Sequence, residues 1–259
     1  MKPTIFHRIL SITLLSGWFC FANAQDQQNN PQGQDLNPYK SITGGLSIRP
    51  IFPSKTFGNG SIPFDTAGVN FTINPKISYS AGAVIRRSFT KLLSMEAGLN
   101  YTRRVYSMKV VDTNNLTTFI DYRTISFNFP VQGIVSVQLS KQVFSSLGFG
   151  LVFDIYPSDI LVKQGVFYNV GGLRTSLIGG SLLVNFGFEY RTKQDGILYL
   201  GGSYNRPFQN IYYNEITYDI DGRRLQKGSY LSGSYIALEF RYYLQPSLIK
   251  KKEKKKKKG

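Results

Sequence analysis

The chain of 259 residues almost lacks the side chains that most catalytic and metal sites use. It contains one Cys, one His and one Trp, which are Cys20, His7 and Trp18. All three lie in the first 24 residues, so a mature chain that loses this segment has none of them. Such a chain has no Ser-His-Asp or Cys-His catalysis, no zinc site of thiolates or imidazoles, no His-ligated haem and no disulfide. We therefore predict no metal site and no cofactor.

The segment 1–24 has the parts of a secretory signal peptide. It begins with basic Lys2 and Arg8, continues with a mostly apolar run over 9–21, and ends in the small-x-small cleavage site Ala22-Asn23-Ala24. The apolar run is too short to span a bilayer comfortably, and no later window is long and apolar enough for a transmembrane helix. We predict export beyond the inner membrane, with an uncleaved anchor as the alternative.

The formal net charge of +16 would by itself indicate a nucleic-acid partner or an anionic surface. Much of it lies in the Lys-rich segment 245–259, where like charges repel one another and favour disorder. Residues 25–40 are polar and predict a flexible leader. The folded unit is therefore expected at 41–244, and it is only modestly basic.

The Lys-rich tail is open to three interpretations. It is a solvated periplasmic tail, it contacts anionic lipid headgroups or cell-wall polymer, or it binds nucleic acid. Nucleic acid is the least favoured, because no aromatic residues are interleaved with the lysines, and we expect no such partner. The lysines that would contact an anionic partner are Lys250, Lys251, Lys252, Lys254, Lys255, Lys256, Lys257 and Lys258.

Apolar and polar residues alternate with period two along the body of the chain, which is typical of β-strands. Eight such segments lie near 42–52, 76–88, 93–102, 125–135, 147–155, 182–191, 197–206 and 234–244. A soluble β-sandwich would also alternate in this way. The polar faces are rich in Gly, however, and small residues suit a crowded barrel interior better than a solvated surface. We predict an all-β fold, an eight-stranded antiparallel transmembrane β-barrel.

The connections between these segments alternate in length. Short ones are expected at 89–91, 138–142 and 192–196, and long ones at 53–75, 110–117, 157–179 and 208–229. Short periplasmic turns and long outer loops are typical of outer-membrane barrels, and an even strand count places both termini in the periplasm. Tyrosines near strand ends predict aromatic girdles at the two interfaces, with the ordinary enrichment of Tyr in β-strands as the alternative. They are Tyr101, Tyr106, Tyr122, Tyr156, Tyr190, Tyr204, Tyr212, Tyr230, Tyr242 and Tyr243.

One strand carries an unusual proline. The segment Ile125–Gln132 runs into an apolar-Pro-apolar step at Pro130, followed by a short turn and a strand that alternates with Gly. Together with the Ala24-Gln25 junction and the closing strand Ala237–Tyr242, this pattern resembles the small outer-membrane β-barrel family of Bacteroidota, often called PorT-like. The resemblance covers most of 41–244. It implies a location in a Gram-negative outer membrane and, in some members, a role in type IX secretion.

Charged residues lie on the polar faces that the alternation directs into the lumen. They are Arg86, Glu96, Arg104, Glu189, Arg191, Glu239 and Arg241. An eight-stranded barrel has an interior just wide enough for side chains, so charges there must pair. We predict an interlocked ion network that fills the barrel, with a gated polar path or a ligand site as the alternative. Glu189 and Glu239 as a carboxylate pair for acid-base work is a third interpretation.

The absence of His from the mature chain bears on enzymatic function. Acyltransferases, phospholipases, lipid A deacylases and omptin-like proteases of the outer membrane use a His, as a generalisation of those families. We predict a non-enzymatic structural or interaction protein, an accessory to protein secretion or envelope assembly. A narrow porin or small-solute channel is the first alternative, and an enzyme of undetected type is the second. The expected partners are outer-membrane lipid and other envelope or secretion proteins.

Overall fold

A computed structural model describes residues 42–54, 60–66, 68–90, 92–111, 115–164, 168–192, 196–220 and 223–244. The predicted signal peptide, leader and Lys-rich tail lie outside these residues. Within them the secondary structure consists of β-strands. No helix long and apolar enough to cross a membrane is found in this described part of the chain.

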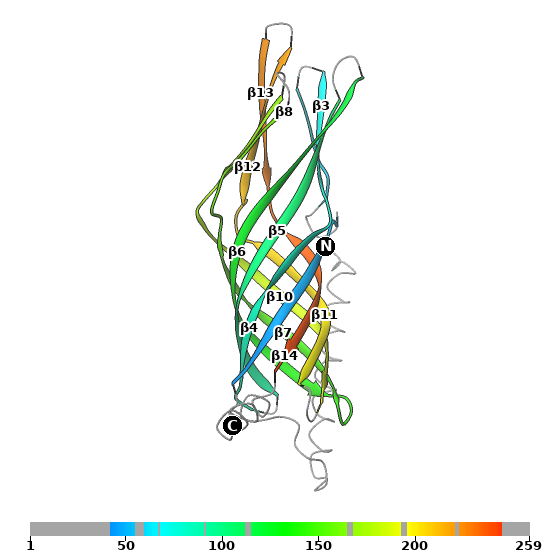
Figure 1. Cartoon of the computed structure of the whole chain (residues 1–259), viewed down its shortest axis with the longest axis vertical. Coiled ribbons are helices and arrows are strands. Elements are labelled where there is room, and N and C mark those ends of the chain that lie inside the picture. Colours follow the sequence, from blue (N-terminus) through cyan, green and yellow to red (C-terminus); the bar gives the residue numbers. More distant parts are fainter. Residues whose placement is uncertain are drawn as a thin grey trace, which may run out of the picture.

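Eight strands form a closed antiparallel barrel (Figure 1). Around the barrel they are β1 (Ile42–Phe52), β4 (Ser78–Ser88), β5 (Leu93–Val111), β6 (Thr117–Gln138), β7 (Val143–Ile155), β10 (Ile178–Arg191), β11 (Ile197–Pro207) and β14 (Tyr235–Tyr243). The ring closes because β14 pairs with β1, with Tyr243 opposite Gly45. Closure pairs both edges of the sheet, so no edge strand remains in the ring. All eight predicted segments are barrel strands, which confirms the predicted fold.

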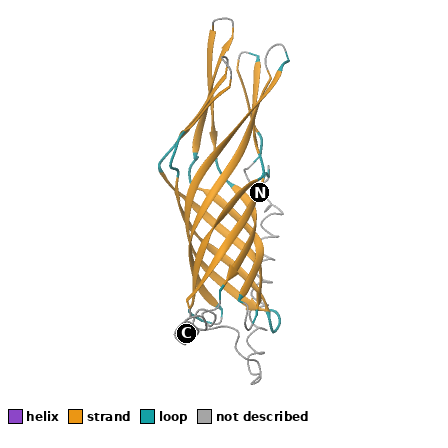
Figure 2. Cartoon of the chain, in the orientation of Figure 1, coloured by secondary structure: helices purple, strands orange, loops and turns teal. Residues whose placement is uncertain are grey.

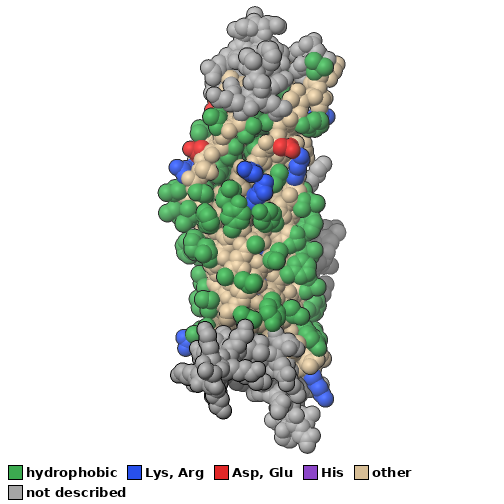
Figure 3. Space-filling model, in the orientation of Figure 1, with side chains coloured by type: hydrophobic (Ala, Val, Ile, Leu, Met, Phe, Trp, Pro, Cys, Tyr) green, Lys and Arg blue, Asp and Glu red, His purple; other side chains and the backbone are tan. Residues whose placement is uncertain are grey.

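The barrel wall is apolar on the outside and polar on the inside. Large apolar side chains on every barrel strand are between 36% and 65% exposed. This apolar belt includes Leu46, Ile48, Ile85, Leu99, Phe127, Phe129, Leu147, Phe149, Leu151, Phe153, Phe186, Phe188, Leu198, Leu200, Leu238 and Phe240. The space-filling view shows hydrophobic side chains over the wall, with Lys, Arg, Asp and Glu above them (Figure 3). The apolar side chains therefore point outward and the polar ones inward, as in a membrane barrel and opposite to a soluble sandwich.

Short turns join the strands at one end of the barrel (Figure 2). The backbone N–H of Phe89 donates to the carbonyl of Leu93 over 3.0 Å, and that of Thr192 donates to Gly196 over 3.0 Å. Gly196 has φ +105°, which favours glycine, and a Cβ there would lie 2.2 Å from the carbonyl of Tyr243. The described chain enters β1 and leaves β14 at this same end.

The long connections at the opposite end are themselves β-structure, which the sequence did not reveal. They contain β2 (Ile62–Thr66), β3 (Val69–Pro75), β8 (Ile160–Gln164), β9 (Tyr168–Arg174), β12 (Tyr212–Ile220) and β13 (Arg223–Leu231). β5 and β6 stay paired as far as Val111 and Thr117, so strand pairing reaches both ends of the connection expected at 110–117. The hairpin β2–β3 extends the sheet beside β5, and β8, β9, β12 and β13 form a separate sheet. We call this β-structured end of the molecule the cap.

An apolar core fills the space between the two sheets of the cap. Its buried members are Val69, Phe71, Ile73, Tyr106, Met108, Val110, Ile120, Tyr122, Tyr156, Val170, Ile211, Tyr212, Ile216 and Leu231. Tyr106 stacks on Tyr122 with ring centroids 5.5 Å apart, and Tyr156 meets Tyr212 edge to face at 5.8 Å. These four tyrosines are therefore buried core residues, and the prediction that they belong to an interfacial girdle is wrong. Tyr190 is exposed on a barrel strand, as a girdle requires, whereas Tyr230 lies on the cap strand β13 and Tyr243 is buried.

Candidate functional site

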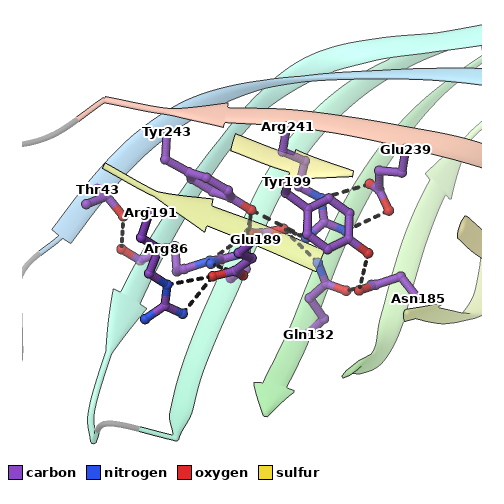
Figure 4. Close-up of polar contacts among 11 residues, drawn as sticks. Thr43, Arg86, Gln132, Asn185, Glu189, Arg191, Tyr199, Glu239, Arg241 and Tyr243 are labelled. Carbon is purple, nitrogen blue, oxygen red and sulfur yellow. Dashed lines mark hydrogen bonds and ion pairs between the residues drawn. The ribbon is translucent and has the colours of Figure 1, made fainter. Parts of the chain in front are cut away.

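The lumen of the barrel holds a network of charged side chains that we call the lumen network (Figure 4). Seven of its members are charged: Arg49, Arg86, Glu96, Glu189, Arg191, Glu239 and Arg241. They project inward from β1, β4, β5, β10 and β14. Each of them is 5% exposed or less, and the outward side chains of the surrounding wall are apolar. Buried charges are tolerated only when they are paired, so the pairing decides what the network can do.

Glu239 lies between two arginines from neighbouring strands. Arg241 donates from Nε over 2.9 Å to one carboxylate oxygen and lies with Nη2 2.7 Å from the other. Arg49 of β1 brings its Nε to 2.5 Å from the same carboxylate. Two guanidinium groups therefore hold one carboxylate, and they join β1 to β14 at the closure of the ring.

Glu96 of β5 also lies between two arginines. Its oxygens lie 2.9 Å from Nη1 of Arg241 and 3.3 Å from Nε of Arg86. The hydroxyl of Tyr243 donates to the same carboxylate and accepts a hydrogen bond from Nη2 of Arg86 over 2.6 Å. The guanidinium of Arg86 also lies 4.1 Å from the centroid of the Tyr243 ring. Glu96 thus connects β4, β5 and β14 through its arginine and tyrosine partners.

Glu189 completes the set of carboxylates. Arg86 donates to one of its oxygens over 2.6 Å, and Arg191 donates twice to the other, over 2.9 and 2.6 Å. Arg191 also stacks over the ring of Phe144 on β7, with 3.8 Å to the ring centroid. Every carboxylate of the lumen network therefore faces two guanidinium groups.

Two side-chain amides extend the lumen network past glycines of β7. Gln132 of β6 donates to Glu96 over 2.6 Å and accepts from the side-chain amide of Asn185 on β10. This bond crosses β7, which lies between the two strands. β7 has Gly148 and Gly150 at the crossing, and a Cβ on Gly148 would lie 2.5 Å from the Asn185 side chain. Gly is thus the residue that leaves room for the link.

The network closes the lumen at its level. Glu189 and Glu239 have 0% exposed surface, and Glu96 and Arg241 have 2%. Tyr199 of β11 adds its ring under the Arg241 guanidinium, at 4.6 Å from the centroid. Side chains from seven barrel strands thus meet at this level of the lumen, and the eighth strand, β7, contributes its glycines there. Beyond the network, the cap has an apolar core of its own.

Arg104 lies apart from this network. The structure brings together six of the seven lumen residues that the sequence predicts, but Arg104 lies toward the cap, and its guanidinium is 4.9 Å from the ring centroid of Tyr235. It is only 4% exposed. Its guanidinium interacts electrostatically with the hydroxyl of Tyr106, and it donates no well-aligned hydrogen bond within the described part of the chain.

Sequence reasoning missed several members of the site. Arg49 went unnoticed because β1 was a weak segment, although Thr43, Ser47 and Arg49 share one period-two face and are all buried. Asp154 of β7 was also missed, and it accepts hydrogen bonds from Asn128 and, over 2.8 Å, from Ser181. Asp154 and Val152 are two residues apart on β7, so their side chains share one face of the strand, and both are buried. The lysines predicted to contact an anionic partner lie outside the described residues.

Metal binding finds no support in the part of the chain that the structure describes. No group of three or more Cys, His, Asp or Glu side chains gathers there in a way that could hold a metal ion. Each of the three carboxylates of the lumen network faces two guanidinium groups, so none of them is left unpaired as a ligand for a metal ion.

No family model matches the chain, and no curated protein matches it in sequence. Among solved structures, the outer membrane protein OprG from Pseudomonas aeruginosa resembles it with a TM-score of 0.49 and 11% identity over 80% of this chain and 98% of that one. The β domain of the Bordetella autotransporter BrkA has a TM-score of 0.31, 9% identity and coverage of 80% and 99%. The outer membrane protease OmpT from Escherichia coli has a TM-score of 0.29, 11% identity and coverage of 79% and 91%.

Proposed function

We propose that this chain is a non-enzymatic outer-membrane barrel with a closed lumen, which presents its cap to partners outside the cell. The observation that carries the proposal is the complete burial of Glu189 and Glu239 in a network that involves the whole ring of strands. An open pore would leave such carboxylates in contact with water. A narrow channel, the alternative function, requires the ion pairs to separate before any solute can pass.

The apolar belt supports a location in a membrane. Exposed Leu and Phe side chains encircle the barrel, and a closed barrel satisfies its backbone hydrogen bonds without water, as lipid requires. Outer-membrane barrels turn tightly in the periplasm and extend their long connections outside. On this basis we place the short turns and both ends of the described chain in the periplasm, and the cap outside. The predicted signal peptide is consistent with this route.

The pairing of the carboxylates supports a function without catalysis. General bases and nucleophilic carboxylates need an accessible, reactive oxygen. Glu96, Glu189 and Glu239 each face two guanidinium groups and have almost no exposed surface. A substrate therefore has no access to them while the network is intact.

The cap offers surface for a protein partner. Phe119 on β6 and Leu161 on β8 are 58% and 70% exposed, and both lie on strands that form the cap. Single exposed apolar side chains occur on most surfaces, so the proposal rests on the position of these two on the cap strands. We propose an envelope or secretion protein as the partner, in line with the role that the PorT-like resemblance implies, and an anionic periplasmic contact for the Lys-rich tail.

Site-specific photocrosslinking in native outer membranes tests this function. A photoreactive residue at Phe119 or Leu161 should produce a discrete adduct with a protein. The same residue at Phe149, which is 60% exposed in the apolar belt, is the matched control and should label lipid. Cap positions that give only lipid adducts, or none, would contradict the interaction function. If deletion of 250–259 does not change the recovered partners, the tail has no part in binding them.

A further inference from the structure

An apolar groove runs along the outside of the barrel wall over β6, and we call it the wall groove. It has a volume of about 490 Å³, within the range of roughly 300–1,000 Å³ that is typical of small-molecule sites. Its apolar lining comes from the turn between β4 and β5 and from the outer faces of β5, β6 and β7. The residues are Phe89, Met95, Val131, Gly133, Leu151 and Phe153. The wall groove therefore opens within the apolar belt and not into the lumen.

Differences in side-chain size between neighbouring strands create the wall groove. Val131 and Gly133 point outward from β6 and form its floor. Larger side chains flank them, because Gly133 pairs with Met95 on one side and with Phe149 on the other. A Cβ at Gly133 would have only the carbonyl oxygen of Phe149 within 4 Å, at 4.0 Å. The fold therefore does not need glycine at this position, and its absent side chain leaves room on the outer face.

The wall groove is elongated along the strands. At one end, the backbone N–H of Phe89 donates to the carbonyl of Leu93. Leu93 pairs with Val135 of β6. At the other end, Phe153 pairs with Phe129 of the same strand. The two ends are six residues apart on β6, or roughly 20 Å. A long, narrow and apolar space of this kind fits an extended acyl chain.

A cation lies at the short-turn end of the wall groove. Arg87 of β4 pairs with Met95, and its exposed side chain points outward like that of Ile85. Its guanidinium carbon lies 5.6 Å from the centroid of the Phe89 ring. Among the residues that the structure describes, no carboxylate forms an ion pair with Arg87. The guanidinium is therefore available to an anionic group at this end of the groove.

We propose that the wall groove binds one anionic phospholipid, with an acyl chain over Val131 and Gly133 and the phosphate at Arg87. Lipid tails are as apolar as the groove, so apolar contact alone would not select one molecule from the bilayer. The arginine supplies the selection, because a guanidinium binds phosphate through charge-assisted hydrogen bonds. The site rests on the proposed function, since a lipid of the periplasmic leaflet reaches it only if the belt lies in the membrane with the short turns in the periplasm.

Native mass spectrometry of the protein released from detergent micelles tests the acyl-chain contact. With phosphatidylglycerol added, the wild type should retain one lipid. Gly133→Leu places a side chain in the groove without a clash and should lower this retention about tenfold, because the acyl chain loses its close contacts there. Gly202→Leu is the matched control. Gly202 is an exposed glycine of β11 whose added Cβ would have only the carbonyl oxygen of Ala237 within 4 Å, so retention should not change.

The headgroup contact has its own test in the same measurement. The wild type should retain phosphatidylglycerol about fivefold better than phosphatidylethanolamine, a preference of the size that one arginine gives near a membrane surface. Arg87→Gln should remove this preference, whereas Arg206→Gln, at an exposed position near the cap end of β11, should keep it. Equal retention of the two lipids by the wild type would overturn the contact with Arg87.

Two outcomes would overturn the wall groove as a lipid site. One is equal retention of phosphatidylglycerol by the wild type, Gly133→Leu and Gly202→Leu. The other is a wild-type dimer that Gly133→Leu converts to a monomer, because a second copy of the chain would then fill the groove. Either outcome leaves the lipid adduct of a photoreactive residue at Phe149 in place. Failure of the membrane location itself would remove that adduct, so the two failures are distinguishable.

Discussion

Each buried carboxylate of the lumen network is held by two arginines, and this double contact makes single residues important. Neutralising one carboxylate leaves two guanidinium groups without their counterion in an environment that water does not reach. Breaking a buried pair from one side is much more unfavourable than replacing the whole pair by apolar residues. Substitutions of single charges should therefore affect stability far more than exposed ion pairs do.

Glu239→Gln tests this at the closure of the ring. The substitution keeps the size of the side chain but leaves Arg49 and Arg241 without their shared carboxylate. We expect the free energy of unfolding to fall by about 3–5 kcal/mol. Urea unfolding in lipid vesicles measures it, and a loss below about 1 kcal/mol would show that the pairs do not hold the barrel together.

Asp121→Asn is the matched control for Glu239→Gln, because it breaks an exposed ion pair. Lys76 donates to both Asp121 oxygens over 3.0 and 2.8 Å, and this hydrogen bonding holds the pKa of the carboxyl below its ordinary value. Both side chains are about half exposed, so the loss should stay below about 1 kcal/mol. Because the pKa is lowered on folding, the contribution is present above the ordinary value of 3.8 and is lost as the pH falls through the lowered one. The wild type and the variant should therefore converge in stability in acid, and a gap that widens in acid would contradict this pairing.

The sequence predicts the inward face of these residues but not their height in the lumen. Period-two alternation directs both Glu96 and Arg104 of β5 inward, as observed. Their separation of eight residues corresponds to roughly 27 Å along a strand, so they cannot belong to one cluster. Which residues of different strands meet depends on the stagger between strands, and alternation within a strand contains no information about it.

At the scale of elements, the cap is the part that departs most from what the sequence indicates. β2, β3, β8 and β9 are only five to seven residues long, and turns and Gly interrupt the pattern around them. Short strands of this kind are stable only where a second sheet covers them. The pairing across the cap core comes from contacts distant in sequence, which local periodicity does not encode.

Phe71→Ala tests whether the cap core is a cooperative unit. Phe71 is 1% exposed in this core, and truncation of a buried Phe typically lowers the free energy of unfolding by about 3–5 kcal/mol. We expect faster proteolysis and hydrogen exchange in β2, β3, β8 and β9, with unchanged protection of the barrel strands. Asn70→Ala, an exposed neighbour on β3, should leave both regions unchanged. Equal protection of the cap in Phe71→Ala and the wild type would contradict the cap as a packed core.

At the scale of the whole molecule, two apolar surfaces have opposite roles. Phe149 in the belt and Phe119 on the cap are 60% and 58% exposed, so their exposure alone does not distinguish them. Only the belt continues around all eight strands, and only a continuous belt can meet lipid on every side. The eight-stranded ring and its apolar exterior could be predicted from the alternation, because each strand contains that signal locally.

Arginine at these two positions separates the roles. Phe149→Arg places a charge in the lipid-facing belt and should lower the free energy of unfolding in vesicles by about 2–4 kcal/mol. Phe119→Arg places the same charge in water and should change it by less than about 0.5 kcal/mol. Equal effects at the two positions would contradict the proposed depth of the barrel in the membrane.

The conductance of the purified wild-type protein in a planar bilayer tests the closed lumen most directly. With the lumen network intact and the cap core above it, the barrel should insert without steady open-channel currents. A channel-forming porin reconstituted in the same way shows that insertion is detectable. Steady, reproducible current steps from the wild-type protein would contradict the closed barrel and favour the narrow channel.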